Sequence, residues 1–233
     1  MLTKLPSFVP SPSLRGCVDD GDWVALVVDW VDGRHPDPAD PADLDRVLGL
    51  LQELADLTGG IEIDGVEPLA ATHPDMFDHW RLLAGDAPAG LDDWSRRHVE
   101  RIAEVDRHAA EATAGSHLVH VDVRTDNVLL GSRRDILVDW PGASSGAAWV
   151  DLATLLPALH LDGGPAPADV FDSTSLGRDA DPEAVDAFVT SLAGYFTRLS
   201  LLPAPPGLPT LRGFQAVQGV IARRWVSERL GLD

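Results

Sequence analysis

The sequence predicts an α+β fold, in which a short β-hairpin precedes a mainly helical body that carries a second hairpin in its middle. Two pairs of apolar runs around turn residues indicate the hairpins, and apolar residues at three- and four-residue steps indicate the helices. The chain has 233 residues, 45% hydrophobic and 24% charged, enough for one ordinary core or for one large and one small lobe. This composition excludes a disordered or collagen-like chain. Four tryptophans are expected in the core: Trp23, Trp30, Trp140 and Trp149.

The first hairpin is predicted from residues 14–18 and 23–28, because the residues between them, Asp19-Asp20-Gly21-Asp22, favour a tight turn. The second run contains VALVV and is apolar almost throughout, so we expect it to pack against a core on both faces. The stretch 34–41 that follows is rich in proline, which lacks the backbone N–H that a helix interior needs. We therefore expect a linker there.

The helical body is predicted to begin with a helix over residues 44–57, where apolar residues recur at three- and four-residue steps. Asp43 is its expected N-cap, and Gly59 marks its end. A second long helix is predicted over 91–112, and Gly115 closes it. Pro/Gly-rich loops separate three further predicted helices, over residues 148–159, 182–200 and 211–230.

The chain is strongly acidic, with 18 basic against 37 acidic residues and a net charge of −19. Such a surface repels nucleic-acid phosphates and anionic lipids, so we expect neither as a partner. A cationic substrate would suit the acidity, but a simply solvated surface is the preferred interpretation. Cys17 is the only cysteine, and no apolar run reaches the roughly 18 residues of a membrane helix. We therefore expect a cytoplasmic protein.

The residues that carry chemistry gather around the predicted middle hairpin, whose strands are the apolar triplets 128–130 and 136–138. If the triplets pair directly, Asn127 and Asp139 lie opposite one another, with backbones about 5 Å apart. Asp122 precedes Asn127 in a loop that has room to curl beside them. Amide and carboxylate oxygens suit Mg²⁺, and a further carboxylate is able to accept a proton from a hydroxyl. The alternative is that these three are ordinary turn residues, and the apolar strands on either side of them argue against it.

This segment resembles a known family. His120-Val121-Asp122 through Asn127 is similar to the HxDxxxxN catalytic loop of protein-kinase-like enzymes, and Val138-Asp139-Trp140 is similar to their metal-binding Asp motif. The closest resemblance is to the aminoglycoside phosphotransferases and related small-molecule kinases, whose loop usually reads HGDxxxxN. The stretch from Gly146 to Asp151-Leu152-Ala153 is similar to that family's G-x-x-x-x-DLA segment. The resemblance implies a protein-kinase-like fold.

The resemblance also implies a role for each matching residue at the reaction centre. Asp122 would be the catalytic base that acts on the acceptor hydroxyl, and Asn127 and Asp139 would hold Mg²⁺ against ATP. Arg124 stands where protein kinases keep a lysine that contacts phosphate. Neutralisation of nearby carboxylates is the alternative role for Arg124.

Other matching residues would support or extend the centre. His120 would brace the catalytic loop, and Asp151 would hold the loop's backbone without touching the substrate. Further upstream, Asp29 and Val31 lie in a segment similar to the hinge between two lobes, where their backbone groups would pair with adenine. Val121 departs from the family, which mostly has glycine at this position.

The family's amino-terminal lobe has few counterparts here. It should hold a glycine-rich loop and a lysine, yet about 30 residues precede the hinge-like segment and Lys4 is the only lysine. We therefore assign residues 1–32 to a remnant of that lobe with the hinge, and 33–233 to a catalytic carboxyl-terminal lobe. Either the reading frame begins further upstream or the protein is a degenerate relative. The uncovered apolar faces of the first hairpin predict self-association.

The function that the resemblance implies is ATP- and Mg²⁺-dependent phosphoryl transfer to a hydroxyl of a small molecule. Acidic residues of the later helices would attract an amine-bearing acceptor. Two alternatives stay open: a pseudokinase-like module that binds nucleotide or a small molecule without catalysis, and a metal-dependent hydrolase, which is weaker for want of His and carboxylate clusters. The acidic residues that would attract an amine-bearing acceptor are Asp162, Asp169 and Asp172.

Overall fold

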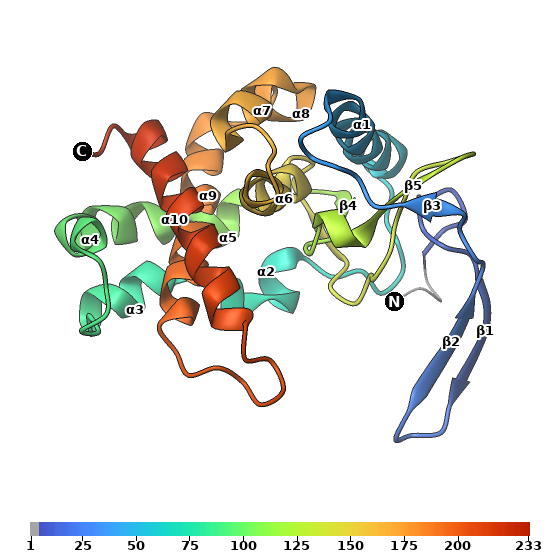
Figure 1. The fold of residues 1–233 in the computed structure, drawn as a ribbon, viewed down its shortest axis with the longest axis horizontal. Coiled ribbons are helices and arrows are strands. Elements are labelled where there is room, and N and C mark those ends of the chain that lie inside the picture. Colours follow the sequence, from blue (N-terminus) through green and yellow to red (C-terminus); the bar gives the residue numbers. More distant parts are fainter. Residues whose placement is uncertain (1–4) are drawn as a thin grey trace.

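The computed structural model describes residues 5–233 and confirms the predicted α+β architecture. The helices gather into one body, and strands β1 and β2 project from it as a separate arm (Figure 1). Two single turns of 3₁₀ helix, Pro74–Met76 and Thr125–Asn127, lie between the elements. The elements in chain order are β1 (Leu14–Asp19), β2 (Val24–Val28), β3 (Gly33–Arg34), α1 (Pro41–Thr58), α2 (Leu69–Thr72), α3 (His79–Gly85), α4 (Asp93–Asp106), α5 (Ala109–Ala112), β4 (His117–Val119), β5 (Val128–Gly131), β6 (Ile136–Leu137), β7 (Ser144–Gly146), α6 (Val150–Leu161), α7 (Pro167–Ser173), α8 (Ser175–Arg178), α9 (Pro182–Ser200) and α10 (Leu211–Leu230).

The arm is the predicted antiparallel hairpin, in which Asp19 pairs with Val24 at the turn. The expected burial of VALVV is wrong, because all five residues of β2 are exposed. The reason is that, among residues 5–233, β2 pairs only with β1 and no second layer covers either face of this two-stranded sheet. Trp23 and Trp30, which we expected in the core, are exposed as well, whereas Trp140 and Trp149 are buried as predicted.

Helix α1 confirms the first predicted helix, with a different N-cap. Asp40, not Asp43, accepts a hydrogen bond from the N–H of Ala42 at 3.0 Å. Asp43 is buried, and its two carboxylate oxygens accept hydrogen bonds from the two Nη atoms of Arg34, at 2.5 and 2.6 Å. That fork lowers the pKa of Asp43 to about 2. The pair fastens the proline-rich linker to α1, and the start of that linker is the short strand β3, which pairs with β5.

The second predicted helix is divided in two. Helix α4 ends at Asp106 and α5 begins at Ala109, so the single helix expected over 91–112 is wrong at this point. Gly115 follows, where a Cβ would come within 2.3 Å of the Gly146 carbonyl oxygen. Glycine therefore lets the chain pass close to β7 before it enters β4. Helices α9 and α10 have the predicted bounds.

The core centres on α6, which lies in the middle of the body (Figure 1). Every residue from Val150 to Leu159 is buried, as expected for a helix that is apolar on all sides. Helices α9 and α10 pack along one another, and Phe188 and Trp225 contribute large buried side chains to the core. None of the helices within residues 5–233 has the length and apolar character to cross a membrane.

Candidate active site

The segment that resembles a catalytic loop connects β4 to β5 through the surface of the body. Strand β4 pairs with β7, and the chain leaves β4 at His120. Val121 then takes a left-handed conformation with φ of 74°, which reverses the chain and brings Asp122 to the surface. The loop closes with a turn of 3₁₀ helix that ends at Asn127.

The side chain of Asp151 binds the backbone at the start of this loop. It lies in the first turn of α6, buried, and its two carboxylate oxygens accept hydrogen bonds from the N–H groups of His120 (2.7 Å) and Val121 (2.8 Å). Burial raises the pKa of Asp151, while the His120 ring and the two N–H donors oppose that rise. Because one carboxylate accepts hydrogen bonds from two consecutive N–H groups, it fixes the direction in which the loop leaves β4.

His120 packs inward from the same point. Its ring lies against Trp140 with centroids 4.6 Å apart, and its Nε2–H donates to the Val138 carbonyl oxygen at 2.9 Å. Burial lowers the pKa of His120, while the charges of Asp151 and Asp139 oppose that shift. The ring thus joins the catalytic-loop segment to the strand that precedes Asp139.

Asp122 and Asn127 lie together, as the sequence suggested. The Asn127 side-chain amide donates to the Asp122 carbonyl oxygen at 2.9 Å and reaches the Asp122 carboxylate at 3.4 Å. Asn127 is buried, whereas about half of the Asp122 side chain is exposed. Burial raises the pKa of Asp122, the Arg124 charge opposes it, and the charges of Asp126 and Asp139 add to the rise. Asp122 is therefore an accessible carboxylate with a strengthened affinity for a proton.

Arg124 is engaged with carboxylates in this structure. Its Nε and Nη2 donate to Asp126 at 2.9 and 2.7 Å, and its Nη1 lies 3.7 Å from the Asp122 carboxylate. These contacts match the alternative of a residue that neutralises nearby acids. A contact with phosphate stays a prediction.

The expected register of the middle hairpin is wrong by one residue. Val128 pairs with Leu137, so Asn127 lies opposite Val138, whose N–H donates to the Asn127 carbonyl oxygen at 2.9 Å. Asp139 comes one residue later, where a left-handed φ of 65° turns the chain out of the hairpin. Asp139 is exposed, and its charge contributes to the raised pKa of Asp122. The carboxylates of Asp122 and Asp139 therefore interact electrostatically. Asn127 and Asp139, however, do not face each other across the strands.

The donor set of this region fits a hard divalent cation. Within residues 5–233, the Asn127 side-chain oxygen accepts no hydrogen bond, and the Asp139 carboxylate has neither a hydrogen bond nor an ion pair. Both are oxygen donors of the kind that Mg²⁺ prefers, and Mg²⁺ commonly takes one or two protein ligands beside phosphates and water. The described chain holds no group of three or more His, Cys, Asp or Glu side chains arranged for a metal ion. The free oxygen donors of Asn127 and Asp139 are thus of the type that a phosphate-bound cation takes as ligands.

A cavity of about 450 Å³ opens beside Asp122. Helix α9 contributes Tyr195, whose pKa is raised by burial and by the charges of Asp75 and Asp122. No signal in the sequence pointed to these walls, because they come from segments far apart along the chain. The lining also includes Asp75, Arg124, Phe196, Phe214, Gln215 and Gln218.

Other residues singled out from the sequence lie elsewhere. Asp29 forms an ion pair with Arg15 at 2.5 Å and donates its N–H to the Ser13 carbonyl oxygen at 3.0 Å. Pairing of adenine with backbone groups of Asp29 and Val31 stays a prediction. Asp162 accepts a hydrogen bond from the Thr125 hydroxyl at 2.6 Å.

The predicted amine-attracting residues do not surround the cavity beside Asp122. Asp169 and Asp172 lie on α7, and neither they nor Asp162 line that cavity. The three residues therefore do not support recognition of an amine-bearing acceptor there.

The fold and this loop together define a phosphotransferase of the protein-kinase-like class. The sequence profile described as "Phosphotransferase enzyme family" matches residues 2–188, and the chain belongs to that family. The resemblance noted in the sequence is thereby confirmed. A comparison with curated proteins gave no match.

Solved structures show the same fold at low sequence identity. An aminoglycoside phosphotransferase from Alicyclobacillus acidocaldarius is 17% identical with a TM-score of 0.57, over 97% of this chain and 78% of that chain. A choline/ethanolamine kinase family protein from Mesorhizobium loti is 18% identical with a TM-score of 0.61, over 95% and 78%. A thermostable mutant of aminoglycoside phosphotransferase APH(4)-Ia, in a ternary complex with AMP-PNP and hygromycin B, is 15% identical with a TM-score of 0.56, over 97% and 78%.

Proposed function

We propose that the protein transfers the γ-phosphate of ATP, with Mg²⁺, to a hydroxyl group of a small molecule that occupies the cavity beside Asp122. One observation carries the proposal. Asp122 is an accessible carboxylate on the wall of this cavity, and it adjoins Asn127, whose side-chain oxygen has no partner within the described chain. A hydroxyl nucleophile and a phosphate-bound cation therefore have donors next to one another.

Each residue has a defined task in this proposal. Asp122 accepts the proton of the acceptor hydroxyl or orients that hydroxyl, and its raised pKa favours proton acceptance. Asn127 and Asp139 are the residues that would hold Mg²⁺, which when bound supplies positive charge to the phosphate oxygens. His120 and Asp151 do not touch the substrate, since they position the loop.

The hinge-like segment completes the nucleotide site in the proposal. The carbonyl group of Asp29 and the N–H of Val31 would pair with adenine. The Asp29 carboxylate is already engaged by Arg15, so the side chain is not needed for this contact.

Replacement of the base tests the proposal. In Asp122→Ala, ADP release coupled to product formation should fall by at least about 1,000-fold, because the loss removes proton transfer and hydroxyl positioning together. ATP binding measured by calorimetry should stay within a few fold of the unchanged protein. Asp169→Ala, an exposed change on α7, is the matched control and should keep full turnover. Turnover in Asp122→Ala equal to that of the control would overturn the proposal.

A second candidate function is binding without turnover. The observation in its favour is that residues 5–233 contain arginines but no lysine, so the described chain has no counterpart of the phosphate-contacting lysine of kinases. ATP titration with and without Mg²⁺, run beside an ADP-release assay, separates the candidates. Mg²⁺-dependent ATP binding with turnover supports transfer, and binding without turnover on any acceptor supports the binding module.

A further inference from the structure

The side-chain amide of Gln218 is the most unusual feature of the cavity beside Asp122. Gln218 lies on α10 with only 2% of its surface exposed, and it lines the cavity. Its amide makes no hydrogen bond with any described residue, and neither of its polar atoms is fully sealed from solvent. An amide that is taken out of water without a partner costs about 1–3 kcal/mol. Since both polar atoms keep some exposure, their partner is whatever fills the cavity, water or a bound ligand.

The side-chain amide of a neighbouring glutamine, Gln215, also lacks part of its hydrogen bonding. Gln215 is 5% exposed and lies one turn earlier on α10. Its side-chain oxygen accepts a hydrogen bond from Arg212 at 2.8 Å, while its NH₂ group has no partner among the described residues. Two neutral amides thus present hydrogen-bonding groups to whatever fills the cavity.

Aromatic rings form the apolar part of the same wall. Tyr195 and Phe196 of α9 lie with ring centroids 5.4 Å apart, and Phe214 of α10 lines the cavity with them. Flat apolar side chains bind the faces of a ring or a short apolar chain. The volume of about 450 Å³ falls in the lower part of the range of small-molecule sites.

The charge of the cavity is small for so acidic a protein. Among the described residues, Asp75 and Asp122 are the only carboxylates that line it, and the Arg124 guanidinium lies 3.7 Å from Asp122. A ligand with several positive charges would leave most of them without a carboxylate in this cavity, and burial of an unpaired charge is expensive.

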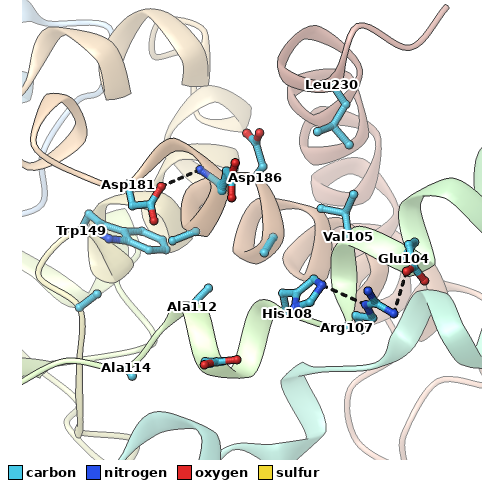
Figure 2. Close-up of a pocket in the computed structure, with 15 residues that line it drawn as sticks. Glu104, Val105, Arg107, His108, Ala112, Ala114, Trp149, Asp181, Asp186 and Leu230 are labelled. Carbon is cyan, nitrogen blue, oxygen red and sulfur yellow. Dashed lines mark hydrogen bonds and ion pairs between the residues drawn. The ribbon is translucent and has the colours of Figure 1, made fainter.

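More carboxylates line another hollow, which shares no lining residue with the first. Figure 2 shows this hollow, which Trp149 lines at one side and to which helices α4, α5, α9 and α10 contribute; its volume is about 870 Å³. The net charge of −19 therefore says little about the acceptor. The acidic residues around this hollow are Glu104, Glu111, Asp181, Glu183 and Asp186.

We infer that the acceptor is a ring-bearing alcohol with no more than one positive charge, and that Gln218 selects it through a hydrogen bond from its side-chain amide. The inference rests on the proposed function, since it names the substrate class of the same site. Gln218 determines specificity through contact with the acceptor and takes no part in proton transfer.

A panel of acceptors tests the substrate class. Glucose, glucosamine and kanamycin represent a neutral ring alcohol, a ring alcohol with one amine and a ring system with several amines. The full chain should bind and phosphorylate glucose or glucosamine with kcat/KM at least tenfold above that for kanamycin. An equal or better value for kanamycin would overturn the inference, as would binding of none of the three in calorimetry.

Variants of Gln218 test the selecting residue. Gln218→Met keeps the length of the side chain without its hydrogen bonds, and it should raise the acceptor KM by 10- to 100-fold while kcat and the KM for ATP change less than threefold. Gln218→Glu adds a carboxylate and should shift preference toward the amine-bearing acceptors by at least tenfold. Val217→Ala, an exposed neighbour on α10, is the control and should leave each constant unchanged.

The outcomes separate this inference from the proposed function. If turnover depends on Asp122 but Gln218→Met has the KM of the unchanged protein, only the inference fails. If turnover does not depend on Asp122, the proposed function fails as well.

Discussion

The N–H of Val121 donates a hydrogen bond of 2.8 Å to the Asp151 carboxylate, and Val121 itself has a left-handed φ of 74°. This backbone region is unfavourable for any residue with a Cβ and most of all for a β-branched one. The chain nevertheless adopts it, because two hydrogen bonds from consecutive N–H groups end on one buried carboxylate. The loop that carries Asp122 is thus held in a strained form by a residue of α6.

Replacement of Val121 by glycine should relieve this strain. Left-handed backbone costs roughly 1–2 kcal/mol for a residue with a Cβ, and glycine loses about 0.5–1 kcal/mol through its freer unfolded chain. We expect Val121→Gly to raise the free energy of unfolding by up to about 1 kcal/mol, measured by urea denaturation. Val121→Ala keeps the Cβ and loses the methyl groups, so it should be less stable than Val121→Gly. The reverse order of the two variants would contradict strain at this position.

The same hydrogen bonds make Asp151 vulnerable to an isosteric change. Asn has one acceptor oxygen and one NH₂ group, so Asp151→Asn would set a donor against one of the two N–H groups in a buried site. We expect a loss of about 2–4 kcal/mol in the free energy of unfolding, measured by urea denaturation. Asp45→Asn, an exposed change on α1, is the control and should cost less than about 0.5 kcal/mol. A loss in Asp151→Asn no larger than in the control would rule out this brace.

The bounds of two helices could be predicted more fully than the environment of the arm. The apolar period and the flanking Pro/Gly loops define α9 and α10, whose bounds are those expected. The run VALVV in β2 is as apolar as a buried strand, but burial depends on whether a second layer covers the sheet, and no part of the described chain does so. The residues of one strand carry no information on that point.

The candidate site was predicted in its parts rather than in its geometry. Asp122 and Asn127 lie together because they share one short loop. The position of Asp139 was wrong by one residue, since β6 is only two residues long and the apolar triplet hides where the strand ends. Gln218 could not be predicted, because an apolar pattern does not say which polar side chain of a helix is drawn into a cavity with a distant loop.

The exposed arm predicts concentration-dependent self-association. Val24 and Leu26 are 60% and 46% exposed and lie on the same face of β2. Apolar side chains on an uncovered two-stranded sheet favour contact with another copy. We expect sedimentation velocity to show larger species as the concentration rises, and the double variant Val24→Lys, Leu26→Lys to stay monomeric with an unchanged melting temperature.

A second surface provides the control for the arm. Val220 is 57% exposed on α10, and Val220→Lys should leave the association unchanged. An unchanged protein that is monomeric at every concentration would contradict this prediction, and so would equal effects of the two sets of lysines.

Asp106 should make the stability of the fold depend on pH. It is 2% exposed at the end of α4, where one carboxylate oxygen accepts the N–H of Trp80 at 3.1 Å and the other has no partner among the described residues. Burial raises the pKa of Asp106 from 3.8 to about 6. The folded protein therefore binds this proton more tightly than the unfolded chain does.

The sign of the effect follows from that difference. The stabilisation by the bound proton is complete below about pH 4 and is lost as the pH rises through about 6, a change of roughly 3 kcal/mol or less. Asp106→Asn keeps a neutral side chain at every pH, so it should be more stable than the unchanged protein at pH 7.5, and the advantage should shrink toward pH 4. Urea denaturation of both proteins across this range measures the difference, with Glu100→Gln on the exposed side of α4 as the control. An advantage of Asp106→Asn that is the same at pH 4 and pH 7.5 would show that Asp106 does not titrate in this range.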